Sequence, residues 1–114
     1  MENIIYNELR YRGYSVDVGV VEKREMSEHG KQIRKALEID FVANLGSQRY
    51  YIQSALSMPT PEKQIQEKTS LINVADSFKK IIIVKDIVNV KRDENGIVTM
   101  SIYDFLLKEN SLDL

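Results

Sequence analysis

The sequence contains no cysteine and only one histidine, His29, in its 114 residues. Without cysteine the chain has no disulfide, zinc–thiolate site, iron–sulfur cluster or cysteine nucleophile, and it suits a reducing compartment. A single histidine excludes any site that needs a pair of them, and no glycine-rich phosphate loop of either common spacing occurs. Any metal bound here would therefore be a hard cation held by carboxylates.

Long apolar runs are also missing. The longest, residues 81–84, is far short of the roughly 20 residues that span a bilayer, so we expect no membrane segment. The chain begins without a basic region or a small-residue cleavage site, so a cytoplasmic location is the expectation.

Neither sign of charge is in excess. Lys and Arg number 16 and Asp and Glu 17, which gives a formal net charge of −1. This balance opposes non-specific binding of nucleic acid through a general positive field and leaves a local basic patch as the remaining route.

What is present suits one compact domain over residues 1–114, because 43% of the residues are apolar and 29% are charged. The first half of the chain predicts a helix at residues 2–12, stopped by Gly13, and a valine-rich strand at 15–22. The charged residues 23–35 show no apolar period, so they predict a solvated loop with a mobile tip. A hairpin follows, with one strand around residues 37–42 and the next at 49–55.

The second half opens on a proline-containing stretch in which Thr60 is suited to cap a helix and Pro61 to start it. We expect this helix to end near Ser77 or Phe78. Residues 81–84 form a short apolar run typical of a central strand. Asn95-Gly96 predicts a second hairpin, and a short helix follows at 103–107. Ile65, Leu71, Ile72 and Ala75 are expected to face inward on the helix that Pro61 starts. The fold class is thus α/β, in the order αβββαβ with a C-terminal hairpin and a short helix.

Three side chains stand out for their positions. A helical wheel places Glu2 with Ile5 and Leu9, toward the buried face. Strand alternation places Asp40 beside Glu38 on one face of its strand. On the next strand it places Gln53 on the same face as Tyr51 and Ala55.

This order of elements resembles the core of the PD-(D/E)xK nuclease superfamily, the restriction-endonuclease-like and Holliday-junction-resolvase-like type. In that superfamily metal ligands lie on the first helix and on the second and third strands. The resemblance therefore implies a site at Glu2, Asp40 and Gln53, with Glu2 and Asp40 as metal ligands. The fit fails at the third strand, because Gln53-Ser54-Ala55 stands where an acidic-x-lysine triplet is expected.

More closely, the chain resembles the uncharacterised C-terminal domain of prokaryotic AAA-type ATPases. The segments that carry this resemblance are ENIIYNEL (2–9), RGYSV (12–16), EIDFV (38–42), YYIQ (50–53) and IYDFLL (102–107). It implies that the chain is a C-terminal fragment of a larger ATPase, whose upstream domain would be its partner. The P-loop of such an ATPase does not occur in these residues.

The resemblance implies a degenerate, non-catalytic nuclease-like module that binds nucleic acid, DNA included, or assists assembly. With Gln53 and Ala55 in the triplet, the site lacks one negative ligand and the lysine that stabilises developing charge. We therefore expect no cofactor, and Mg²⁺ only if the site is active, with Lys63 or Lys68 as a replacement cation. The alternatives are an active Mg²⁺-dependent nuclease and a protein–protein interaction domain.

Overall fold

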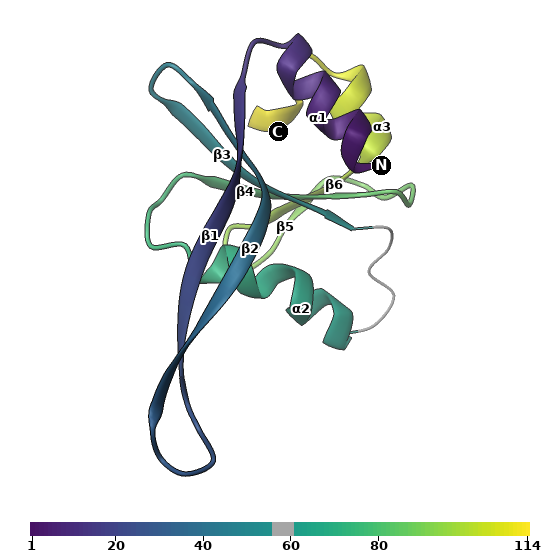
Figure 1. Ribbon diagram of the computed structural model, residues 1–114. Helices are drawn as coiled ribbons and strands as arrows, with labels where there is room; N and C mark the ends of the chain where they lie inside the picture. Colours follow the sequence, from purple (N-terminus) through teal and green to yellow (C-terminus); the bar gives the residue numbers. More distant parts are fainter. Residues whose placement is uncertain (56–60) are drawn as a thin grey trace.

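The computed structural model describes residues 1–55 and 61–114 and shows a mixed α/β fold (Figure 1). Thr60, predicted as a helix cap, lies outside the described residues. The elements run in the predicted order: α1 (Glu2–Tyr11), β1 (Ser15–Met26), β2 (Gln32–Leu45), β3 (Gln48–Ala55), α2 (Pro61–Ile72), β4 (Lys79–Val84), β5 (Lys91–Arg92), β6 (Val98–Ser101), α3 (Ile102–Leu107) and the 3₁₀ turn η1 (Ser111–Asp113).

The described strands form one six-stranded mixed sheet in the order β1-β2-β3-β4-β6-β5. β1, β2 and β3 pair antiparallel, β3, β4 and β6 pair parallel, and β5 closes the second hairpin against β6. The parallel pairs require crossovers, which α2 supplies between β3 and β4. β4 lies between β3 and β6 with its last four residues buried, so the prediction of a central strand is confirmed.

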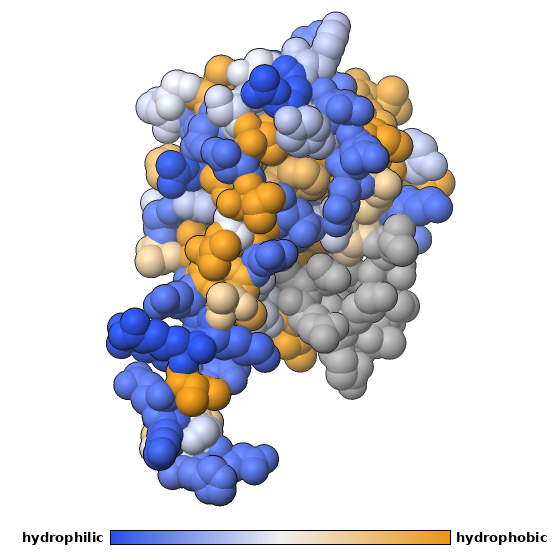
Figure 2. Space-filling model, viewed as in Figure 1, coloured by the Kyte–Doolittle hydropathy of each residue, from blue (hydrophilic) through white to orange (hydrophobic). Residues whose placement is uncertain are grey.

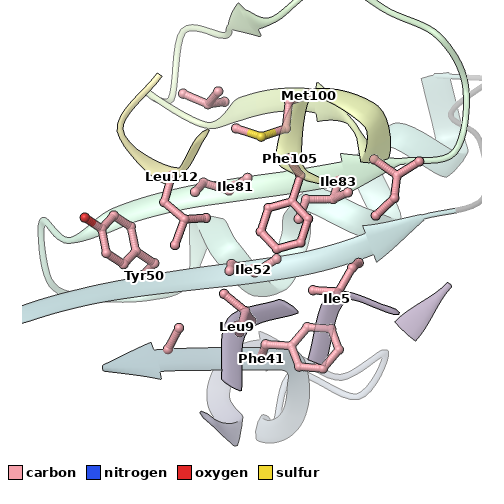
Figure 3. Packing of buried hydrophobic residues seen from close by; sticks show 13 residues of the cluster. Ile5, Leu9, Phe41, Tyr50, Ile52, Ile81, Ile83, Met100, Phe105 and Leu112 are labelled. Atoms are coloured by element: carbon pink, nitrogen blue, oxygen red, sulfur yellow. The ribbon is translucent and has the colours of Figure 1, made fainter. Parts of the chain in front are cut away.

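Helices cover both faces of this sheet. α1 and α3 lie side by side on one face, hereafter the α1 face, and α2 lies on the other, the α2 face (Figure 1). The core on the α1 face packs Ile5 and Leu9 against Phe105 and the inward residues of the central strands (Figure 3). The core on the α2 face is smaller and includes Leu71 and Ile82.

The solvated loop predicted at residues 23–35 is wrong, because β1 and β2 continue as a paired ribbon to Met26 and Gln32. Only a short turn remains, in which the backbone N–H of Ser27 donates to the Lys31 carbonyl at 2.7 Å. The charged composition misled the prediction. A strand pair that leaves the body of a protein is paired by its backbone and needs no apolar period.

The prediction that α2 runs to Ser77 or Phe78 is also wrong. The helix ends at Ile72, and Asp76 Oδ1 then accepts the backbone N–H of Phe78 at 3.0 Å, a local turn that competes with helix. Of the residues predicted to face inward, Leu71 is buried, whereas Ile65, Ile72 and Ala75 are exposed. None of the helices in the described ranges is both long and apolar enough to cross a membrane.

Candidate functional site

The candidate site begins with a β-bulge in β2. β1 and β2 pair Asp17 with Val42 and Gly19 with Ile39, so the single residue Val18 faces two residues, Asp40 and Phe41. Consequently Ile39 and Val42 both pack in the core on the α2 face, although two residues separate them. Alternation breaks between Asp40 and Phe41, which both lie on the α1 face, whereas Asp40 shares the face of Glu38 as predicted, on the opposite side from Ile39.

The bulge directs the Asp40 carboxylate toward Ser54 on β3. Asp40 Oδ2 accepts the backbone N–H of Ser54 at 2.8 Å and lies 3.1 Å from the Ser54 hydroxyl. Glu2, at the start of α1, brings its Oε1 to 3.3 Å from the same hydroxyl. Two carboxylates from distant parts of the chain therefore meet on one serine.

The Ser54 hydroxyl holds one proton, so it donates to only one of the two carboxylates at a time. This meeting point is open to water, because the Glu2 side chain is solvent-exposed. Beside it lies an open cavity of about 390 Å³ lined by Met1, Glu2, Asn3 and Ser54.

Gln53 lies next to Asp40 but does not join the two carboxylates. Its Oε1 accepts the backbone N–H of Asp40 at 2.7 Å, and its Nε2 donates to the backbone oxygen of Glu38 at 3.2 Å. The pairing of β2 with β3 stops at Phe41 and Ile52, whereas β3 continues along β4. The buried Gln53 amide therefore replaces the missing ladder bonds where β2 separates from β3.

The structure thus brings Asp40 and Glu2 together and gives Gln53 a different position. Strand alternation places Gln53 on the α2 face with Tyr51 and Ala55, whose side chains pack there, and Ser54 on the α1 face. The contacts of Ser54 could not be predicted, because an ordinary serine in a strand gives no signal until the bulge is known.

The expected replacement cation is not found among the described side chains. Lys68 Nζ forms an ion pair with Asp93 Oδ2 at 2.8 Å, while the side chain of Lys63 lies outside the described part of the chain. Nor do the described residues contain any group of three or more histidine or acidic side chains arranged to hold a metal ion.

Comparison with known proteins identifies one relative of uncharacterised role. A protein of Haemophilus influenzae described as an uncharacterized protein is 32% identical over 108 residues, which cover 95% of this chain. The chain spans 23% of the length of that relative. No protein-family model matches the chain.

Proposed function

We propose that this chain is a degenerate, restriction-endonuclease-like module that serves an AAA-type ATPase as a nucleic-acid-binding or assembly domain. Three observations support the nuclease-like ancestry: the αβββαβ order, the acidic residue on β2 and the acidic residue on α1 that approaches it. The greater length of the Haemophilus relative is consistent with a domain that occurs within longer chains.

The observation that carries the loss of catalysis is the position of Gln53. A metal-dependent nuclease needs carboxylates that converge on Mg²⁺ and a cation beside the attacking water. Here Gln53 lies on the α2 face and its amide oxygen accepts the backbone N–H of Asp40, whereas the Asp40 carboxylate lies on the α1 face with Ser54, so the amide is not positioned as a third ligand beside that carboxylate. Ala55 is buried in the core on the α2 face, at the position where the superfamily has lysine.

The same geometry predicts weak binding of metal. Asp40 and Glu2 supply two carboxylates, and Asp40 Oδ2 already accepts the N–H of Ser54. Mg²⁺ gives up its water reluctantly and is usually held by carboxylates together with substrate phosphates. Calorimetric titration with Mg²⁺ and Mn²⁺ is therefore expected to show weak binding, and tight stoichiometric binding that Asp40→Asn abolishes would favour the catalytic alternative.

Incubation with DNA tests the proposal directly. Branched, single-stranded and duplex DNA are incubated with the protein and Mg²⁺ or Mn²⁺, beside Asp40→Ala and the matched variant Asp86→Ala, which removes an exposed carboxylate outside the site. We expect no cleavage by any of the three proteins. Cleavage that disappears in Asp40→Ala but persists in Asp86→Ala would establish an active nuclease.

Binding measurements separate the two non-catalytic roles. A nucleic-acid-binding module is expected to show an affinity that falls steeply as the salt concentration rises. A protein–protein interaction domain would show no affinity for DNA or RNA at any salt concentration. That result would leave assembly with the ATPase as the function to test, by co-purification with the upstream domain.

A further inference from the structure

The outer part of the β1–β2 hairpin is a projecting arm, defined here as residues 22–36. Its strands pair with each other through five successive residues on each side, from Glu22 with Ala36 to Met26 with Gln32. In Figure 1 the arm runs away from both helical layers, and Figure 2 shows hydrophilic residues over most of its surface. The molecule is consequently 50 Å long but only 25 Å across its shortest axis.

The arm is the basic part of an otherwise acidic chain. It holds five cationic side chains and three acidic ones, whereas the rest of the chain holds eleven and fourteen. The cationic residues are Lys23, Arg24, Lys31, Arg34 and Lys35. This is the local basic patch that the overall charge balance left as the route to a polyanion.

The arrangement of these charges does not serve the stability of the ribbon. Lys23 lies directly opposite Lys35, and Arg24 lies directly opposite Arg34. Like charges in directly opposite positions destabilise a strand pair. Ion pairs of Lys23 with Glu25 at 3.1 Å and of Arg34 with Glu22 at 4.0 Å offset this only in part, because all four side chains are solvent-exposed to a third or more.

Because neighbouring residues of a strand point to opposite faces, the two cationic pairs lie on opposite faces of the ribbon. A flat acidic surface, such as a membrane or a protein, would contact one face and leave the other pair unneutralised. A groove with two anionic walls would neutralise both. The major groove of B-form DNA has phosphates along both walls, and at about 12 Å it is wide enough to admit a two-stranded ribbon, unlike the minor groove of about 6 Å.

We propose that the arm is a duplex-DNA-binding element that enters the major groove with its tip first. The inference rests on the proposed role as a nucleic-acid-binding module and specifies where that binding occurs. Arg24 and Arg34, at one position on the two strands, would contact the phosphates of one wall. Lys23 and Lys35 would contact those of the other.

The test compares matched double variants by fluorescence anisotropy on a labelled duplex of about 20 base pairs, between about 50 and 200 mM salt. Arg24→Gln with Arg34→Gln removes one cationic pair of the arm. Arg10→Gln with Lys108→Gln removes two exposed cations from the helical side and gives the same net charge. Arg24→Lys with Arg34→Lys keeps the charges, and circular dichroism verifies that each variant is folded.

We expect the arginine-to-glutamine arm variant to bind about 10- to 100-fold more weakly at 100 mM salt, with a salt dependence shallower by about two phosphate contacts. The lysine arm variant and the helical-side variant should bind like the parent. Equal affinity of parent and glutamine arm variant would overturn the role of the arm and leave nucleic-acid binding intact. If the parent binds single-stranded DNA as tightly as the duplex, the inference that the arm enters the major groove is wrong. If the parent binds no nucleic acid at all, the proposed nucleic-acid-binding function is wrong as well.

Discussion

Truncation of Gln53 to alanine is the sharpest perturbation that the bulge offers. Gln53 is 6% exposed, and its amide satisfies the backbone N–H of Asp40 and the backbone oxygen of Glu38. Gln53→Ala leaves both groups without a partner at the point where β2 separates from β3. An unsatisfied buried polar group costs about 1 to 3 kcal/mol, and Asp40 is only half-buried, so we expect a total loss of about 2 to 4 kcal/mol in the free energy of unfolding.

Urea unfolding followed by far-UV circular dichroism and tyrosine fluorescence measures this loss, since the chain has six tyrosines and no tryptophan. Gln32→Ala, an exposed glutamine of the arm, is the matched control, and its change should stay within about 0.5 kcal/mol. A loss below about 1 kcal/mol for Gln53→Ala would refute the view that this amide replaces the ladder bonds.

Gln53→Glu adds a test with a definite sign. The new carboxylate still accepts the N–H of Asp40 but faces the carbonyl oxygen of Glu38 with no proton to donate. Burial and this repulsion would raise its pKa, so the variant should gain stability relative to the parent as the pH falls through that raised value. Comparison of urea midpoints at pH 7 and pH 5 measures the effect. No difference between the variant and the parent in their response to pH would show that the new carboxylate has turned to solvent.

Three further predictions concern the scaffold around the site, each read from urea or thermal unfolding. Arg12→Ala should lose about 3 kcal/mol, because its side chain is 13% exposed and its guanidinium donates to the carbonyl of Phe105 at 2.6 Å, and a loss below about 1 kcal/mol would contradict this. Gly19→Ala should lose about 1 to 3 kcal/mol, because its Cβ would lie 2.8 Å from Val42 Cγ2, and a further Val42→Ala should recover part of the loss. Burial alone raises the pKa of Asp93, but the Lys68 ion pair and two backbone N–H bonds lower this pKa overall below its ordinary value. The loss in the free energy of unfolding caused by Asp93→Asn should therefore be largest near pH 7 and should shrink as the pH falls below about 4.

Much of the fold could be predicted because local signals agreed with the final packing. The apolar run in β4 indicated a strand covered on both faces, and Asn95-Gly96 indicated the hairpin that β5 and β6 form. Gly13 ended α1 as predicted, with φ of 94°, a left-handed conformation that favours glycine. In these segments the residue types that favour the local structure also meet the needs of the final packing: apolar side chains in β4 and a glycine where α1 ends.

The site could be predicted only in part, because a bulge has no signature in alternating residues. Asp40 and Glu2 were identified by type and by position on their elements, and the structure brings them together. Their contact with Ser54 depends on one extra residue in β2, which only the pairing with β1 reveals. The same extra residue puts Ile39 and Phe41 on opposite faces of the sheet, where strict alternation would put them on one face. Pairing register is a property of two strands and cannot be read from either alone.

The arm also bears on association between copies of the protein. β1 is the first strand of the sheet, no described strand pairs with its outer edge, and Val18 and Val20 are exposed along it. An open strand of this length is a template for strand exchange or aggregation. Lys23 and Arg24, together with three acidic residues, place charged side chains along that strand, and these oppose pairing with a second copy because they would be partly desolvated there. Removal of these charges should therefore promote self-association at high protein concentration, a change that light scattering would detect.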